Sequence, residues 1–181
     1  MGADKAFLEF DGETFLERAV KTLSNLSAVK IVLNQSQTHF IEKLPAGTKY
    51  IFDVFENRGA PGGIHTALQN CAGEFAVILA VDLPFVTTEA IENLANFALA
   101  SNKYIATVPR QTDGRPQPLC AIYRAKYCLP TLEKLLNEND SASVRDFLDL
   151  IFPKYVEAKR LDANDNLLFN VNFPSDFEQM C

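Results

Sequence analysis

The sequence predicts an α/β fold, in which a wound, mostly parallel sheet carries helices on both faces. Short apolar runs rich in β-branched residues alternate with segments of helical spacing. The run at 75–81 is apolar throughout, as expected for a strand that helices cover on both sides. With 181 residues, of which 48% are hydrophobic and 22% charged, the chain is expected to form one globular domain, 1–181.

The first half of the chain contains these elements in order. After Gly12, apolar residues at three- and four-residue spacing predict an amphipathic helix over 15–26. A strand at 29–33, a polar helical segment to about residue 42 and a strand at 49–52 follow. A glycine-rich loop at 59–63 then precedes a helix at 64–71, and the apolar strand at 75–81 is expected at the centre of the sheet.

The second half continues the alternation. Thr87 or Thr88 is expected to cap a helix that extends to about residue 100. Strands are predicted at 104–108 and 119–123, helices at about 130–138 and 142–151, and a polar strand near 155–161. Because proline favours the first turn of a helix, Pro130 and Pro174 are each expected to begin one.

The predicted sheet lacks the strand from which its first crossover should leave. The first clear element is a helix, whereas a wound sheet normally starts with a strand in its middle. Loss of that strand would expose ladder edges and apolar faces. We therefore expect upstream residues or a neighbouring chain to fill a gap, and an unbroken sheet would contradict this expectation.

Charge and composition exclude several classes. The formal net charge of -6 lacks the clustered basic face that nucleic-acid binding needs, and a polyanionic ligand would need local cations or a divalent metal. No stretch reaches about 18 apolar residues and no signal peptide is recognisable, so no membrane association and a cytoplasmic location are expected. The four cysteines are scattered and predict reduced thiols rather than a zinc site.

Asp82 and Lys5 are the candidate catalytic residues. Asp82 follows the buried strand, at the edge where open α/β sheets bind ligands, and its carboxylate suits a Mg²⁺ ion that bridges phosphate oxygens. Lys5, in the segment Met1–Lys5, suits the neutralisation of phosphate charge. Asp82 could instead cap the next turn, and Lys5 could be a solvated charge.

Three further elements are candidates for binding a nucleotide. Asn34 and Asp53 each end a predicted strand on the same side of the sheet as Asp82. The loop with Gly59, Gly62 and Gly63 opens a helix, so its N–H groups could approach a base or a phosphate. Each of these segments could equally be a plain turn.

A second group of residues is suited to another anionic or heterocyclic substrate. Arg115 and Gln117 flank a turn before a strand and could form an arm for an anion, or a solvated hairpin. Asn170 and Asn172 point to one side of a short extended piece, where amides suit a heterocycle or the outer shell of a metal. Either amide could also start the turn into the last helix. The sequence contains no nucleophile elbow, Walker loop or GxGxxG motif, so covalent catalysis is not indicated.

The order of these motifs resembles that of the molybdenum cofactor guanylyltransferases, the MobA-like nucleotidyltransferases. The resemblance spans essentially the whole chain and rests on Met1-Gly2-x-Asp4-Lys5, the 59–64 loop, Val81-Asp82-Leu83-Pro84-Phe85, Gln117-Pro118-Leu119 and the Asn-Val-Asn-x-Pro-x-Asp ending. It implies a Rossmann-like fold of the nucleotide-diphospho-sugar transferase type. The family's Leu-Ala-Gly-Gly element is absent before Met1, and the loop reads Gly-Ala-Pro-Gly-Gly where Gly-Pro-Leu-x-Gly is usual.

The resemblance implies transfer of GMP from Mg·GTP to molybdopterin, with release of pyrophosphate. It implies that Lys5 contacts GTP phosphates, that Asp82 ligates Mg²⁺, and that Asn170 and Asn172 face the pterin or the metal. It also implies that Asn34, Asp53 and the loop at 59–63 surround the nucleoside. Proteins of molybdoenzyme maturation are possible partners.

Two alternatives stay open at this stage. The same fold and metal could serve a cytidylyltransferase or a sugar nucleotidyltransferase. The chain could also be a truncated, non-catalytic domain that binds a partner protein.

Overall fold

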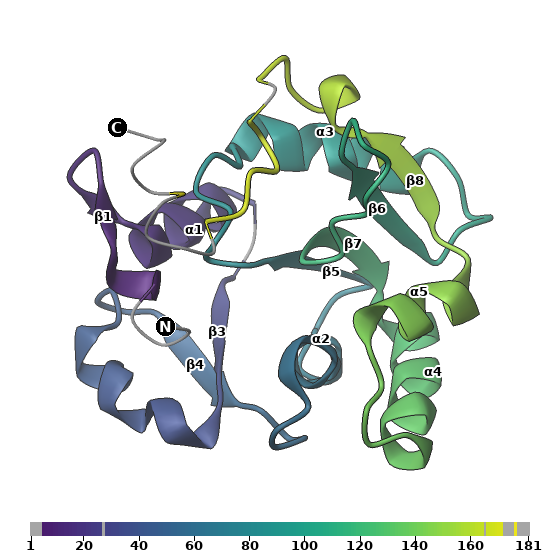
Figure 1. The fold of residues 1–181 in the computed structure, drawn as a ribbon, viewed down its shortest axis with the longest axis horizontal. Helices are drawn as coiled ribbons and strands as arrows, with labels where there is room; N and C mark the ends of the chain where they lie inside the picture. Colours follow the sequence, from purple (N-terminus) through teal and green to yellow (C-terminus); the bar gives the residue numbers. More distant parts are fainter. Residues whose placement is uncertain (1–4, 27, 165, 172–175, 177–181) are drawn as a thin grey trace.

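The strands of the computed structural model form a two-stranded parallel sheet, a four-stranded mixed sheet and one small hairpin (Figure 1). The structure describes residues 5–26, 28–164, 166–171 and 176. One sheet has the order β4–β3, the other the order β5–β7–β6–β8, and β1 pairs with β2 in the hairpin. The strands are β1 (Glu9–Phe10), β2 (Glu13–Thr14), β3 (Lys30–Leu33), β4 (Lys49–Phe52), β5 (Phe75–Leu79), β6 (Ala106–Arg110), β7 (Cys120–Arg124) and β8 (Lys154–Glu157).

The strand directions confirm the predicted wound, mostly parallel arrangement. β3 runs parallel to β4, and β6 runs parallel to β8. β7 is antiparallel to both of its neighbours, β5 and β6, so these two run in the same direction as each other. β7 is therefore the one reversed strand of the four-stranded sheet.

Helices follow the strands and cover both sheet faces (Figure 1). The α-helices are α1 (Phe15–Ser24), α2 (Gly59–Gln69), α3 (Thr88–Leu99), α4 (Ala125–Glu138) and α5 (Val144–Ile151). The 3₁₀ segments are η1 (Lys5–Phe7), η2 (Gln35–Lys43) and η3 (Ala158–Arg160). Side-chain caps fix the first residues of α1, α3 and α5. The hydroxyls of Thr14, Thr87 and Ser143 each accept a hydrogen bond from the backbone N–H of the third residue of the helix that follows. None of the helices among these residues is long and apolar enough to cross a membrane.

Two apolar clusters lie on opposite faces of the four-stranded sheet. One joins α2, α4 and α5 to the sheet through residues such as Leu68, Leu132 and Phe147. The other joins α3 to the opposite face through residues such as Ile91, Leu94 and Ile122. The alternate side chains of β7 enter both clusters, Ala121 and Tyr123 on one side and Cys120 and Ile122 on the other. This double burial explains why β7 is apolar from Cys120 to Tyr123.

Several predicted boundaries are wrong in an informative way. The glycines at 59–63 are not a loop before the helix but the first turns of α2 itself. Pro61 is tolerated there because the first helical N–H groups have no intrahelical partner. α4 begins at Ala125, five residues before Pro130, because buried Ala125 and Cys128 pack this turn against the core. Residues 59–63 are thus helical, where the sequence predicts a loop. The predicted helix after Pro174 lies largely outside the described residues.

The expected break in the sheet is present among the described residues. β3 pairs with β4 alone and β5 pairs with β7 alone, so neither strand has a partner on the edge that faces the other. Two cavities lie between them, lined by β3, β5, α1 and α2. The prediction of exposed ladder edges and apolar faces is therefore confirmed for this part of the chain.

Candidate active site

Asp82 follows the carboxyl end of β5 and is tied to a segment from the far end of the chain. The backbone N–H of Val171 donates to the Asp82 carbonyl over 3.0 Å. With its amide nitrogen turned towards Asp82, Asn170 donates to carboxylate Oδ2 over 2.7 Å and to the same carbonyl over 3.0 Å. The structure thus brings together two predicted site residues, and Asn170 orients the carboxylate that Asp82 presents.

The surroundings of Asp82 favour a positive ligand. Burial raises the pKa of its carboxyl, and the nearby Lys5 charge and the hydrogen bond from Asn170 act in the opposite direction. A partly desolvated carboxylate gains from a cation beside it. The Lys5 charge is close enough to Asp82 to lower the pKa of its carboxyl. This proximity is what one phosphate-binding site formed by both residues would require.

A polar cavity of about 670 Å³ lies at the carboxyl ends of β3 and β4. Its walls include four of the predicted nucleotide-binding residues, namely Asn34, Asp53, Gly59 and Gly63. Gly63 also lines the neighbouring cavity between β3 and β5, as does Val81, the residue before Asp82. The cavity and Asp82 therefore share one edge of the fold, where open α/β sheets bind ligands.

The side chains of this cavity are held by local hydrogen bonds. Asn34 Oδ1 accepts the Ser36 amide over 3.0 Å and caps η2. Asp53 Oδ1 accepts the Phe55 amide over 3.1 Å and the hydroxyl of buried Thr66 over 2.8 Å. Asn34 and Asp53 thus act as turn starters, the alternative left open by the sequence, while they also line the cavity.

Gly62 has a different position from its neighbour glycines. It is buried and does not line the cavity, and a Cβ there would lie 2.9 Å from Asp53 Oδ2 and 2.9 Å from the Phe55 carbonyl oxygen. A Cβ at Gly63 would meet nothing within 4 Å. Gly62 therefore allows α2 to approach the end of β4, and its role as a direct nucleotide contact stays a prediction.

A second polar cavity, of about 460 Å³, brings the predicted acceptor residues together. Arg115, Gln117 and Asn170 all line it, beside Gln111 and Lys159, which sequence reasoning missed. Gln111 Nε2 donates to the Leu168 carbonyl over 3.1 Å, so it also holds the segment that leads to Asn170. Arg115 pairs with Asp113 over 2.6 Å, and Asn172 lies outside the described residues.

Asp82 is the residue that the structure offers to a divalent metal. Among the described residues no three His, Cys, Asp or Glu side chains form a cluster that could enclose an ion. A single carboxylate fits Mg²⁺ nonetheless, because this ion keeps several waters and shares its remaining positions with substrate phosphates. The donor set is thus suited to a metal that arrives with a nucleotide.

Comparison with known structures places this fold in a class. The fold matches the crystal structure of 2-C-methyl-D-erythritol 4-phosphate cytidylyltransferase from Thermus thermophilus, with a TM-score of 0.71 at 14% identity over 98% of this chain and 92% of that one. It matches molybdopterin-guanine dinucleotide biosynthesis protein A from Archaeoglobus fulgidus with a TM-score of 0.80 at 22% identity, over 97% and 87% of the two chains. The fold is that of the nucleotidyltransferases.

The sequence comparisons then identify the family. Residues 1–157 match the model of the MobA-like NTP transferase domain, and the chain belongs to this family of nucleotidyltransferases. A probable molybdenum cofactor guanylyltransferase from Methanothermobacter thermautotrophicus is 33% identical, over 97% of this chain and 90% of the relative. A protein of the same name from Methanosarcina acetivorans is 30% identical, over 98% and 82%. The resemblance drawn from the motifs is confirmed.

Proposed function

We propose that the protein transfers GMP from Mg·GTP to molybdopterin, forming the guanine dinucleotide cofactor and pyrophosphate. The observation that carries this proposal is the position of Asp82 between two cavities. Asn170 contacts Asp82 and also lines the cavity of Arg115 and Gln117, while Val81 and Gly63 connect Asp82 to the cavity of Asn34 and Asp53. Two substrates bound in these cavities would meet at Asp82.

The reaction is an in-line displacement at the α-phosphorus. An oxygen of the terminal phosphate of molybdopterin forms the new P–O bond, the bond to the bridging oxygen of the β-phosphate breaks, and pyrophosphate leaves with that electron pair. Lys5 neutralises charge on the phosphates, and Asn170 holds the Asp82 carboxylate in place. Mg²⁺ bound with GTP would be held by Asp82 and would shield the repulsion between the two anions.

Each cavity has side chains that suit its substrate. Asn34 and Asp53 offer the amide and carboxylate groups that can hydrogen-bond a guanine and a ribose, and the N–H groups at the start of α2 lie beside them. Arg115 and Lys159 supply positive charge to the second cavity of a chain whose net charge is -6. A cytoplasmic location is part of the proposal, because GTP is a cytoplasmic nucleotide.

Nucleotide binding tests the first half of the proposal. In thermal unfolding with Mg²⁺ and GTP, CTP, ATP or UTP, GTP is expected to raise the Tm most. At 100 times the Kd, binding contributes about 2.7 kcal/mol, or roughly 5 to 11 °C for a chain of this size. A larger shift with CTP would favour the cytidylyltransferase alternative, and indifference to all four nucleotides would contradict both enzymes.

Pyrophosphate release tests the second half. GTP, Mg²⁺ and molybdopterin together should release pyrophosphate, and Asp82→Asn should abolish this release while the protein stays folded. The third alternative, a non-catalytic domain, makes the opposite prediction. If Asp82→Asn supports molybdoenzyme activity in cells as well as the unchanged chain does, the enzyme proposal is wrong.

A further inference from the structure

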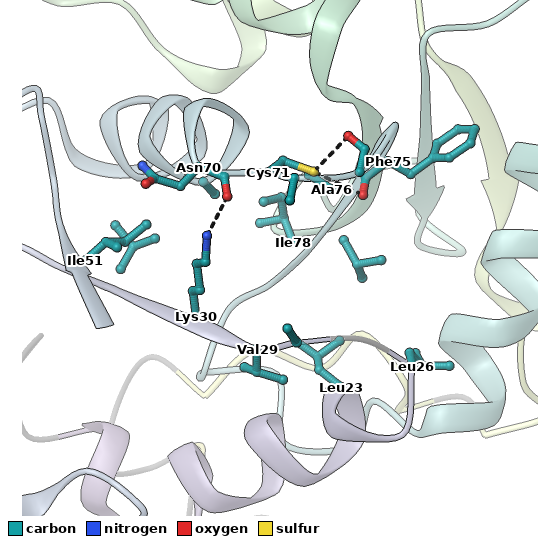
Figure 2. Close-up of a pocket in the computed structure, with 16 residues that line it drawn as sticks. Leu23, Leu26, Val29, Lys30, Ile51, Asn70, Cys71, Phe75, Ala76 and Ile78 are labelled. Atoms are coloured by element: carbon teal, nitrogen blue, oxygen red, sulfur yellow. Dashed lines mark hydrogen bonds between the residues drawn. The ribbon is translucent and has the colours of Figure 1, made fainter. Parts of the chain in front are cut away.

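The acceptor cavity, of about 460 Å³ and lined by Arg115 and Gln117, has an aromatic wall in polar surroundings. Phe169 is the one aromatic side chain among the described residues that line it. Most of the others carry amide, hydroxyl or charged groups, namely Gln111, Thr112, Arg115, Gln117, Lys159, Asn164, Asn166, Asn170 and Asp176. The cavity between β3 and β5 differs, since its walls are largely apolar, with Leu23 and Val29 on one side (Figure 2). A phenyl ring among polar groups is suited to a ligand that has a flat apolar face and a polar edge.

Phe169 is partly exposed, yet its backbone is fixed on both sides. Leu168 before it and Val171 after it are buried in the core. The N–H of Phe169 donates to the Asn166 carbonyl over 2.8 Å, and Gln111 Nε2 donates to the Leu168 carbonyl over 3.1 Å. The ring is therefore presented to the cavity by a segment that packing and hydrogen bonds hold in place.

A row of aromatic rings supports Phe169 from the side of the β1–β2 hairpin. The ring centroids of Phe169 and Phe85 are 6.3 Å apart, at an interplanar angle of 65°, and those of Phe85 and Phe10 are 5.9 Å apart, at 78°. Arg18 closes the row, because its guanidinium lies 5.0 Å from the Phe10 ring centroid and donates to the Phe10 carbonyl. Edge-to-face contacts restrict the tilt of each ring. The row thus orients Phe169 next to Asn170, which contacts Asp82.

Gln117 brings a buried amide to the same cavity. This residue is 8% exposed, and its side chain has no hydrogen-bond partner among the described residues. Its backbone, in contrast, is paired, since its N–H donates to the Pro109 carbonyl and its carbonyl accepts the Cys120 N–H. A buried amide without a partner is unfavourable and gains from a ligand that supplies the missing donor and acceptor. Because an amide donates on one side and accepts on the other, it matches a heterocycle edge that carries both kinds of group.

We propose that Phe169 and Gln117 are specificity residues for the acceptor and select a flat heterocycle with an amide-like edge, as a pterin has. The heterocycle stacks on Phe169, and its edge hydrogen-bonds to the Gln117 amide. Its phosphate then points to Asn170 and Asp82, and this last orientation rests on the proposed guanylyl transfer. Phe85 is a positioning residue, since it acts through the ring of Phe169.

Binding of a small pterin tests the two contacts. The probe is 6-hydroxymethylpterin, which has the heterocycle without the phosphate, and equilibrium dialysis without nucleotide gives its Kd. Phe169→Leu should weaken binding at least about fivefold, because loss of an aromatic platform weakens nucleobase binding by roughly 5- to 150-fold. Gln117→Met, which keeps the side-chain length and removes the amide, should also weaken it several-fold. Phe169→Trp should retain binding, because it keeps an aromatic face.

Phe169→Trp also provides a spectroscopic signature. The chain contains no tryptophan, so this variant has a single indole reporter. Saturating pterin should quench its fluorescence strongly, since the stacked heterocycle lies against the indole. The matched control is Phe152→Trp, at a 79% exposed position before β8, whereas the cavity residues Ala158 and Lys159 follow β8. After correction for absorption by free pterin, the control should be quenched much less.

The outcomes separate clearly. Weaker binding in Phe169→Leu and Gln117→Met at unchanged Tm, together with quenching in Phe169→Trp, supports the proposal. An effect in only one of these two positions would overturn the role of the other residue. Equal Kd values for the unchanged chain and both variants would overturn the proposal, and so would a lack of pterin binding by the unchanged chain at millimolar probe.

The same variants distinguish this inference from the proposed function. If the unchanged chain releases pyrophosphate and Phe169→Leu has the same KM for the acceptor, guanylyl transfer stands and the stacking role is overturned. If pterin binding depends on Phe169 but no pyrophosphate is released, the stacking role stands and guanylyl transfer is wrong. Where both hold, Phe169→Leu should raise the KM for the acceptor several-fold and leave the KM for GTP unchanged.

Discussion

Alanine substitutions at two adjacent glycines should have opposite effects on stability. At Gly62, the added Cβ would lie 2.9 Å from Asp53 Oδ2, 2.9 Å from the Phe55 carbonyl oxygen and 3.1 Å from the Arg58 Cβ. At Gly63, it would meet nothing within 4 Å. Both residues are in α2, so the conformational benefit of alanine over glycine, about 1 kcal/mol, applies to both.

The two contacts below 3.0 Å at Gly62 decide the magnitude there. One of them involves backbone, which cannot rotate away, so the cost falls near the upper end of the range of about 1 to 3 kcal/mol for overpacking. After subtraction of the helix benefit, Gly62→Ala should lower the free energy of unfolding by about 2 kcal/mol. Gly63→Ala should raise it by about 0.5 to 1 kcal/mol.

Urea unfolding and thermal scans of the two variants provide the measurement. A difference of about 3 kcal/mol between them corresponds to roughly 6 to 12 °C in Tm for a chain of this size. The displaced Asp53 carboxylate should also weaken nucleotide binding in Gly62→Ala. If Gly62→Ala proves as stable as Gly63→Ala, the close approach of α2 to the end of β4 is refuted.

Three further predictions concern the site. Asp82→Asn should reduce turnover at least 100-fold and leave the Tm unchanged or higher, because the raised pKa shows that the buried charge itself is unfavourable. Arg115→Gln should raise the KM for the pterin substrate several-fold with little effect on the KM for GTP, measured by initial rates, and equal effects on both would place Arg115 elsewhere. Thr66→Val should cost about 1 to 3 kcal/mol in urea unfolding, since it leaves Asp53 Oδ1 and the Val54 amide without the Thr66 hydroxyl.

The raised pKa of Asp82 also sets the sign of a pH dependence. A carboxyl whose pKa is higher in the folded than in the unfolded state binds more protons when folded, in the window between the two pKa values. Stability from this group therefore falls as the pH rises from its unfolded pKa, near 3.9, through its folded pKa. Asp82→Asn should remove that fall, and a steeper fall in the variant would contradict the assignment. Mg²⁺ with a nucleotide should reduce it as well.

The fold could be predicted well because its elements are encoded locally. The sequence predicts the strand at 49–52 to the residue and narrows the cap of α3 to Thr87 or Thr88, of which Thr87 is the cap, since β-branched runs and capping hydroxyls act within one turn. The errors lie where tertiary packing overrides local signals. Gly59 to Gly63 are typical of a loop, yet they form the start of α2, where Gly62 packs closely against Asp53 and Phe55 after β4. Pro130 is typical of a helix start, yet buried Ala125 and Cys128 extend α4 before it.

The site residues could be found by type and position, but their division of labour depends on contacts that are distant in sequence. The sequence predicts Asp82 as a metal ligand and leaves Asn170 open between the pterin and the metal, and with its amide nitrogen turned towards Asp82, Asn170 donates to the carboxylate over 2.7 Å. A single amide therefore contacts the candidate metal ligand and lines the candidate acceptor cavity. Replacing Asn170 by Asp would put a second charge on an already desolvated carboxylate, raise the pKa of the pair and change the metal dependence as well as the KM for the acceptor. Asn170→Ala would instead remove the orienting hydrogen bond without adding charge. If Asp82 acts where two substrates meet, the Mg²⁺ concentration needed for activity should depend on pH up to a higher pH in the Asp variant than in the Ala variant, because protons compete with Mg²⁺ for the carboxyl pair. Identical Mg²⁺ titrations of the two variants would show that Asn170 serves the acceptor alone.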